Sequence, residues 1–243
     1  MVIKDYFSNI FEKNNSNTLL LHSSLLYKNK SVFKESIYEI KNAIEDLSRE
    51  GFTFILPSYT FSFIKDKFFS TIYSKSETGI LSDLIHQDLC GSIRSSHPIY
   101  SHVFIGPDSE KMSSLLGITT FGEESIFEFL EKINASIALL NCGWEYATIF
   151  HRYEELNKVS YRYYKKFKGK IKHYDEKLKN IEVKMFVRNL ELNPINDMNL
   201  ALDILKTKGS FCKFVSDNFN LTSASVLDIK STCMYLLNKN VFF

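Results

Sequence analysis

The sequence predicts an α/β fold: a mixed, partly parallel central sheet flanked by helices, with a β-rich insertion and a helical C-terminal part. Two observations carry this prediction. From residue 19 to residue 156, short apolar runs alternate with segments whose apolar residues recur at helical spacing, and a strand–helix–strand order implies parallel pairing. After Ser160 the pattern changes to alternating β-forming residues, which is typical of antiparallel strands.

The first three elements predict the parallel part of the sheet. The apolar run Leu19–Leu21 predicts a buried strand that ends in polar side chains. In Ser31–Arg49 the apolar residues lie close to helical spacing, and Ser31 is the expected N-cap. The sequence TFILP at 53–57 predicts the next strand. Together these elements form a βαβ unit.

The later elements follow from the same patterns. Helices are expected over 79–89, 123–133 and 145–156, and strands over 102–107 and 136–140. Two or three antiparallel strands are expected between Tyr161 and Asn193, and a mostly helical tail between Asn199 and Leu237.

Length and composition predict a single domain. The chain has 243 residues, of which 44% are hydrophobic, so it can bury a sizeable core. We expect one domain over 1–243, divided into a core over 1–160 and a β-rich plus helical subregion over 161–243. The 30 basic and 28 acidic residues give a net charge of +2, which argues against a nucleic-acid-binding protein.

The sequence also predicts a cytoplasmic location. No run approaches the roughly 18 apolar residues of a membrane span, and Met1–Asn15 lacks the apolar core of a signal peptide. The four cysteines show no CxxC spacing, so we expect reduced thiols and no membrane partner.

Polar residues follow three of the predicted strands. They are His22, Ser23 and Ser24, then Ser58–Thr60, then the segment after Leu140. Because ligands of parallel sheets bind beyond the carboxyl ends of the strands, these groups are candidate binding residues.

Thr148, His151 and Glu154 are the candidate catalytic residues. On a helix they are three residues apart and share one face. A carboxylate beside an imidazole fixes its tautomer and favours its use as a general base. A hydroxyl can donate to a developing oxyanion. The alternative is a solvated helix face in which the three residues have no joint role.

The stretch RSSHPIYSH, residues 94–102, is a second concentration of polar groups. Arg94 can bind phosphate in bidentate fashion or stabilise the fold, and both interpretations are open. His97 is expected to anchor this loop. A zinc site of His97, His102 and His151 is a further alternative, but their spacing is not that of a zinc motif.

Several segments together resemble the aminoglycoside 3-N-acetyltransferases and their relatives. These segments are LLLHSSL at 19–25, LPSYTFSF at 56–63, the R-S-x-H-P-x-x-S pattern from Arg94 to Ser101, Phe121-Gly122 with Ser125, and the stretch from Leu139 through Gly143 and Thr148 to His151 and Glu154. They occur in the family's order over more than half of the chain. The chain departs from the pattern at Asn141, Ala147 and Phe150, which puts the acceptor in doubt more than the reaction.

The resemblance implies acyl transfer from acetyl-CoA or another acyl-CoA to an amine, without a metal. It implies His151 as the general base, Glu154 as its orienting carboxylate and Thr148 as an oxyanion donor. It further implies that His22, Ser23 and Ser24 line the CoA channel, and we add Thr60 and Arg94 as candidate cofactor-binding residues. Cys142 could instead form an acyl-cysteine, although free cysteines are more often inert packing.

The expected acceptor is an amino sugar, possibly nucleotide-linked. The basis is the Lys-rich run from Arg162 to Lys172, which could attract a phosphorylated acceptor or be a solvated strand face. The alternatives are an aminoglycoside acceptor, as in antibiotic resistance, and a non-catalytic relative that binds CoA or a sugar. A zinc hydrolase remains a third class. The sequence leaves the oligomeric state open.

Overall fold

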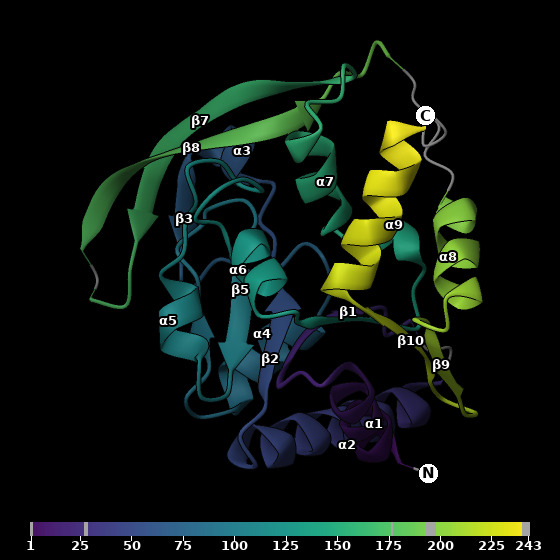
Figure 1. Ribbon diagram of the computed structural model, residues 1–243. Helices are drawn as coiled ribbons and strands as arrows, with labels where there is room; N and C mark the ends of the chain where they lie inside the picture. The colour runs from purple at the N-terminus through teal and green to yellow at the C-terminus, as the bar shows by residue number, and fades with distance from the viewer. Residues whose placement is uncertain (1, 27–28, 176, 193–197, 240–243) are drawn as a thin grey trace.

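The computed structural model describes residues 2–26, 29–175, 177–192 and 198–239 (Figure 1). Within them, a seven-stranded sheet has the order β4-β5-β2-β1-β6-β10-β9, and a three-stranded sheet has the order β3-β7-β8. The strands are β1 (Thr18–Ser23), β2 (Thr53–Pro57), β3 (Phe68–Ser70), β4 (Ile93–Arg94), β5 (His102–Ile105), β6 (Ser136–Leu140), β7 (Arg162–Lys172), β8 (Leu178–Arg188), β9 (Cys212–Val215) and β10 (Asn220–Ser225).

The large sheet is mixed, as the sequence predicts. β1 pairs in parallel with β2 on one side and with β6 on the other. β5 and β10 extend the sheet with antiparallel pairs. The carboxyl ends of β1, β2 and β6 therefore meet at one edge of the sheet, which is where parallel sheets bind ligands.

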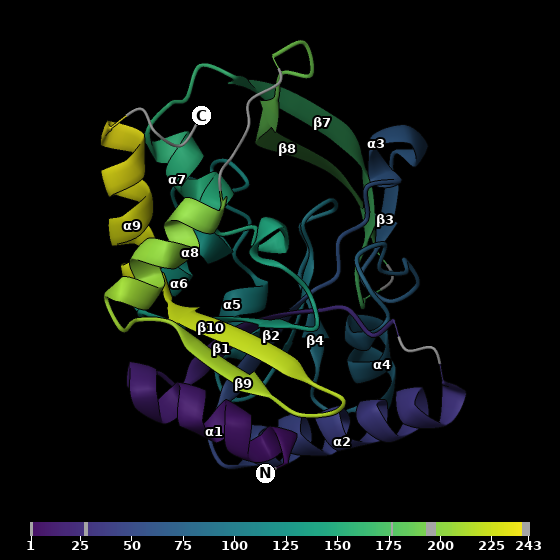
Figure 2. The same ribbon diagram turned by 90° about the vertical axis from the view of Figure 1, so that its right-hand side faces the viewer.

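Helices cover both faces of this sheet. They are α1 (Ile3–Asn14), α2 (Lys30–Arg49), α3 (Phe63–Asp66), α4 (Leu81–Asp88), α5 (Ser109–Ser113), α6 (Ile126–Lys132), α7 (Phe150–Leu156), α8 (Met198–Thr207) and α9 (Val226–Asn238). Figure 2 shows α1 and α2 side by side beneath the sheet, while α6 to α9 lie above it. In the described residues no helix is long and apolar enough to cross a membrane.

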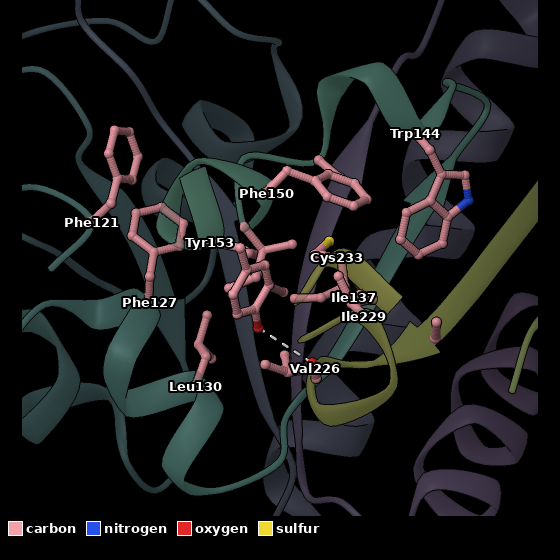
Figure 3. Close-up of a cluster of buried hydrophobic side chains, with 14 of the residues drawn as sticks. Phe121, Phe127, Leu130, Ile137, Trp144, Phe150, Tyr153, Val226, Ile229 and Cys233 are labelled. Carbon is pink, nitrogen blue, oxygen red and sulfur yellow. Dashed lines mark hydrogen bonds between the residues drawn. The ribbon is translucent and has the colours of Figure 1, made fainter. Parts of the chain in front are cut away.

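Two apolar cores result from the alternation of side chains along the strands. In β1, Leu19 and Leu21 pack with α1, α2 and α4, while Leu20 packs on the opposite face, as the period of two requires. The upper core holds α6, α7 and α9 together (Figure 3). There the buried Tyr153 hydroxyl donates to the Val226 carbonyl at 3.3 Å.

The β7–β8 hairpin forms most of the second sheet. It arches from α7 towards α3 and β3 (Figure 1). One face of its outer half carries Phe167, Ile171 and Met185, which form a third apolar cluster with Phe63 and Phe69. The hairpin confirms the antiparallel strands expected after Ser160. Asn193, the end of that expected segment, lies outside the described residues, as does Met1.

Two local expectations were wrong. The helix expected to be capped by Ser31 begins at Lys30, because the Asn29 side chain accepts from the Ser31 N–H at 2.8 Å. The helix expected over 145–156 is split into a 3₁₀ turn, Trp144–Tyr146, and α7. The extended backbone of Ala147, with ψ of 95°, separates the two.

The tail and the N-terminal segment also differ from expectation. The tail contains α8 and α9, but β9 and β10 lie between them and complete the large sheet. Pairing with β6 supplies the partner that makes β10 a strand. α1 was not expected, although Ile3, Phe7 and Ile10 lie on one buried face at helical spacing.

Candidate active site

A pocket of about 900 Å³ lies at the carboxyl ends of β1, β2 and β6. Residues from all three strand ends line it. They include His22, Ser23 and Ser24 after β1, Pro57 and Tyr59 after β2, and Asn141, Cys142 and Gly143 after β6, with Tyr100 and Thr148 completing the inner wall. The structure therefore brings together residues from all three polar strand ends that the sequence indicates.

His151 and Glu154 form a close pair on α7. His151 Nδ1 lies 2.6 Å from Glu154 Oε2. The spacing of three residues within one helix places the two side chains on the same face. The Glu154 side chain is 1% exposed and that of His151 is 28% exposed. The carboxylate is thus shielded, and part of the imidazole is open to solvent.

Two residues just beyond α7 hold the Glu154 carboxylate. The Tyr161 hydroxyl donates to Oε1 at 2.8 Å, and Arg162 Nε lies 2.9 Å from Oε2 in an ion pair. Burial alone would raise the pKa of Glu154, but the hydrogen bond from His151 and the charges of His151 and Arg162 outweigh it and lower the pKa to about 2. Glu154 is therefore ionised at neutral pH.

The same contacts determine which ring nitrogen of His151 carries the hydrogen. An ionised carboxylate can only accept, so Nδ1 carries the hydrogen that is shared with Glu154. Arg162 Nη2 also lies 2.9 Å from Nδ1, but two donors cannot bond each other, so this is a packing contact. Nε2 is then the ring nitrogen with a free lone pair in the neutral form.

Thr148 does not lie on α7 but in the turn that precedes it, so the expected common helix face is shared by His151 and Glu154 alone. The Thr148 hydroxyl lies 2.8 Å from the hydroxyl of Tyr59. Tyr59 is buried, and its hydroxyl lies 3.3 Å from His102 Nε2. Thr148 therefore borders the pocket as the end of a hydrogen-bond chain.

A continuous row of rings connects this chain to His151. The Tyr59 and Tyr100 ring centroids are 4.5 Å apart, and those of Tyr100 and Phe121 are 5.0 Å apart. Phe121 in turn lies 5.2 Å from the His151 ring in an edge arrangement. The contact with Phe121 helps to fix the orientation of the imidazole.

His22 combines burial with an unused polar atom. Burial lowers the pKa of His22 to about 4, so the ring is neutral at physiological pH. Its Nε2 has no hydrogen-bond partner among the described residues. His22 lines the pocket together with Ser23 and Ser24, and their assignment to a CoA channel stays a prediction.

Arg94 and Thr60 lie in the interior instead. Arg94 is 2% exposed, and its guanidinium donates to the Ser58 carbonyl at 2.7 Å, to Thr60 Oγ1 at 2.9 Å, to Ser101 Oγ at 3.2 Å and to the Ser74 carbonyl. Neither Arg94 nor Thr60 lines the pocket. Of the two interpretations of Arg94, these contacts favour the role in fold stability.

The other candidate groups have separate surroundings. His97 Nε2 contacts Thr120 Oγ1 at 2.9 Å, and its Nδ1 accepts from the Tyr100 N–H at 2.9 Å, which matches a loop anchor. Over the described ranges, no group of three His, Cys, Asp or Glu side chains could hold a metal ion. Burial and the Glu145 charge raise the pKa of Cys142 to about 12, so an acyl-cysteine is disfavoured.

The Lys-rich strand β7 is mainly a solvated face. Lys166 and Lys168 are exposed and pair with Glu182 on β8 at 2.7 and 3.1 Å. Neither lysine lines the pocket. Arg162, at the start of the same strand, is the exception, because it turns inward to Glu154. In the sequence, nothing distinguishes Arg162 from the exposed lysines that follow it in the same run, so its role could not be predicted.

Comparisons with known proteins agree with the fold. The sequence profile described as aminoglycoside 3-N-acetyltransferase matches residues 42–223. The crystal structure of aminoglycoside acetyltransferase AAC(3)-IVa, as apoenzyme, is 21% identical with a TM-score of 0.71, covering 99% of this chain and 90% of that one.

Two further solved structures share the fold. AAC-IIIb in a binary complex with CoASH is 13% identical with a TM-score of 0.77, covering 98% of this chain and 96% of that one. The YokD protein from Bacillus subtilis is 17% identical with a TM-score of 0.73, covering 98% of this chain and 94% of that one. No curated protein sequence gives a significant match.

Proposed function

The chain belongs to the aminoglycoside 3-N-acetyltransferase family, and we propose that it moves an acetyl group from acetyl-CoA to an amine with His151 as the general base. The observation that carries the proposal is the pair of a partly exposed His151 and a buried Glu154 beside a pocket that is built from three strand ends. Tyr161 and Arg162 belong to the C-terminal subregion, yet they hold Glu154 of the core. Their contacts support one acyltransferase domain over 1–243.

Each step of the reaction uses a group of known position. A sugar amine is mostly protonated at neutral pH, so it first loses one proton to solvent, and its neutral form is the nucleophile, which gives up a second proton to a base as it attacks. His151 Nε2 takes a proton from the amine nitrogen as that nitrogen bonds to the thioester carbonyl carbon. The carbon–sulfur bond then breaks, and the departing thiolate takes the proton back from the imidazolium. Glu154, ionised at neutral pH, stabilises that imidazolium through Nδ1–H.

The pocket suits the uncharged arm of acetyl-CoA. Its lining combines the Ser23 and Ser24 hydroxyls with apolar side chains such as Leu25 and Leu81, which fits a chain of amides and methylenes. The unpartnered Nε2 of His22 is a further polar group there. No Lys or Arg among the described residues lines the pocket.

An aminoglycoside is the acceptor class that the comparisons favour over the nucleotide-linked amino sugar. AAC(3)-IVa is by its description an aminoglycoside acetyltransferase, and this chain shares its family. The pocket rim carries the carboxylates of Glu77 and Glu145, which attract a polycation rather than a phosphate. Two of the lysines that motivated a phosphorylated acceptor, Lys166 and Lys168, pair with Glu182 instead.

Release of free thiol from acetyl-CoA tests this proposal. Wild type is assayed with aminoglycosides and with nucleotide-linked amino sugars, beside His151→Ala and His173→Ala as the matched control. His173 lies beyond β7 and contacts Ser96. We expect turnover of an aminoglycoside that falls about 10²-fold or more in His151→Ala, as for a removed general base, and is retained in His173→Ala. Equal turnover of wild type and His151→Ala would refute the assignment of the base. Faster turnover of a nucleotide-linked sugar would reverse the choice of acceptor.

A further inference from the structure

Tyr59 is a buried hydroxyl that the proposed reaction does not use. It is 3% exposed and lines the inner wall of the pocket. Its hydroxyl lies between two polar atoms, Thr148 Oγ1 at 2.8 Å and His102 Nε2 at 3.3 Å. Burial raises the pKa of Tyr59, so the phenol keeps its hydrogen at neutral pH. The Tyr59 hydroxyl can therefore donate its one hydrogen to only one of these two neighbours, and its oxygen must accept a hydrogen from the other.

The tautomer of His102 determines the direction of the hydrogen bonds between Thr148, Tyr59 and His102. It is 1% exposed, and burial, with the charges of His22 and His97, lowers its pKa to about 3. The ring is thus neutral and carries one hydrogen. The backbone of Tyr100 hydrogen-bonds the ring and raises its pKa, as a carbonyl acceptor does. Because Nε2 faces the Tyr59 hydroxyl at 3.3 Å, the ring nitrogen that donates to this carbonyl is Nδ1, so the hydrogen lies on Nδ1.

The donor and acceptor roles of Tyr59 and Thr148 follow from this tautomer of His102. With the hydrogen on Nδ1, Nε2 of His102 can only accept. The Tyr59 hydroxyl then donates to His102, and its oxygen is left to accept from Thr148. The hydrogen of Thr148 is therefore directed at Tyr59, and a lone pair of Thr148 Oγ1 is directed into the pocket.

We propose that Tyr59 is a positioning residue that fixes the Thr148 hydroxyl as an acceptor for an N–H of the attacking amine. The proposal rests on the proposed acyl transfer. It revises the expected role of Thr148, because an oxygen whose hydrogen is held by Tyr59 cannot donate to the oxyanion. The amine then has two partners, with Nε2 of His151 taking one hydrogen while Thr148 orients another.

The tautomer of His102 can be tested without any turnover. Nitrogen-15 NMR of the side-chain imidazoles distinguishes a protonated from an unprotonated ring nitrogen, and the signals of His102 are assigned by their loss in His102→Gln. We expect Nδ1 protonated and Nε2 unprotonated at pH 7.5. A hydrogen on Nε2 would reverse the chain and overturn the proposal, whether or not the protein acetylates any amine.

A double-mutant cycle then tests the link to catalysis. Tyr59→Phe removes only the hydroxyl, and Thr148→Val replaces the hydroxyl by a methyl group of similar size. With acetyl-CoA saturating, we expect each single change to lower kcat by about tenfold, the effect of one neutral hydrogen bond, with KM for acetyl-CoA unchanged. In the Thr148→Val background, Tyr59→Phe should have no further effect.

The alternative outcomes are distinct. If Tyr59→Phe lowers kcat equally in both backgrounds, Tyr59 acts through packing and the proposal fails. His102→Leu tests the chain from its other end and should also lose its effect on kcat in Thr148→Val; melting temperatures identify any variant that does not fold. Failure of the proposed function would instead show as unchanged turnover in His151→Ala, while the coupling between Tyr59 and Thr148 would still be measured.

Discussion

Replacing Glu154 by glutamine should lower both the stability of the protein and its rate of catalysis. The substitution keeps the shape and an acceptor oxygen, so the hydrogen bonds from Tyr161 or His151 can partly persist. It removes the negative charge, however, and leaves Arg162, whose side chain is 9% exposed, as a buried cation without its counterion. Breaking a buried ion pair from one side typically costs roughly 3 to 5 kcal/mol.

The pKa of Glu154 gives an independent magnitude. Its pKa is lowered from 4.5 to about 2, which corresponds to roughly 3 kcal/mol in favour of the ionised form. We therefore expect Glu154→Gln to lower the free energy of unfolding by about 3 kcal/mol and the melting temperature by roughly 6 to 12 °C. We expect kcat to fall by about 10²-fold or more, because His151 loses the group that orients it and stabilises its cation.

Glu155 supplies the matched control. It is the next residue, is also buried, and accepts from Thr119 and from the Tyr164 hydroxyl rather than from His151. Urea unfolding and acetyl transfer are measured for Glu154→Gln and Glu155→Gln. Both variants should lose stability, and only Glu154→Gln should lose kcat. A Glu154→Gln protein that is less stable but fully active would refute the pair as a catalytic unit.

Two further predictions concern stability alone. The imidazoles of three buried histidines have pKa values lowered by burial to about 3 or 4 (His22, His97 and His102). In the unfolded chain these imidazoles bind a proton near pH 6.5, so the stability of the protein should fall as the pH drops below 6.5. The loss should be roughly 2 kcal/mol per histidine at pH 5. Equal urea midpoints at pH 7.5 and pH 5 would contradict this. Gly106→Ala should destabilise by roughly 2 to 4 kcal/mol, because φ is +124° and a Cβ would meet the Phe52 carbonyl oxygen at 2.3 Å. Gly209→Ala, with positive φ but open space, should cost roughly 1 kcal/mol; similar losses in both would contradict the steric argument.

The sequence was most informative in segments where one spacing of apolar residues, that of a strand or that of a helix, dominates. The buried runs of β1, β2 and β6 and the helical spacing of α2 identified the parallel sheet, and the alternation after Ser160 identified the hairpin. β10 was missed because its strand conformation depends on pairing with β6, far away in the chain. Local patterns contain no information about such a partner.

The candidate site also combines contacts that are local in the sequence with contacts that depend on the tertiary fold. The spacing of His151 and Glu154 is local and made them a candidate pair, and the family resemblance then assigned their roles. The residues that hold the pair or border it are brought by other elements. Arg162 turns inward from a strand whose other basic residues are exposed, and Tyr59 reaches Thr148 from the end of β2. Their roles depend on tertiary contacts that no spacing rule describes.

The position of β10 has a consequence for synthesis of the protein on the ribosome. β10 lies between β6 and β9, and Leu140 of β6 pairs with Leu221 of β10. At about 5 to 20 residues per second, the nascent chain waits roughly 4 to 16 s between emergence of the two. During that interval β6 is an apolar strand with one unpaired edge, which is a template for wrong pairing. Nascent chains stalled before residue 220 should therefore recruit chaperones or aggregate, whereas chains released after β10 should not.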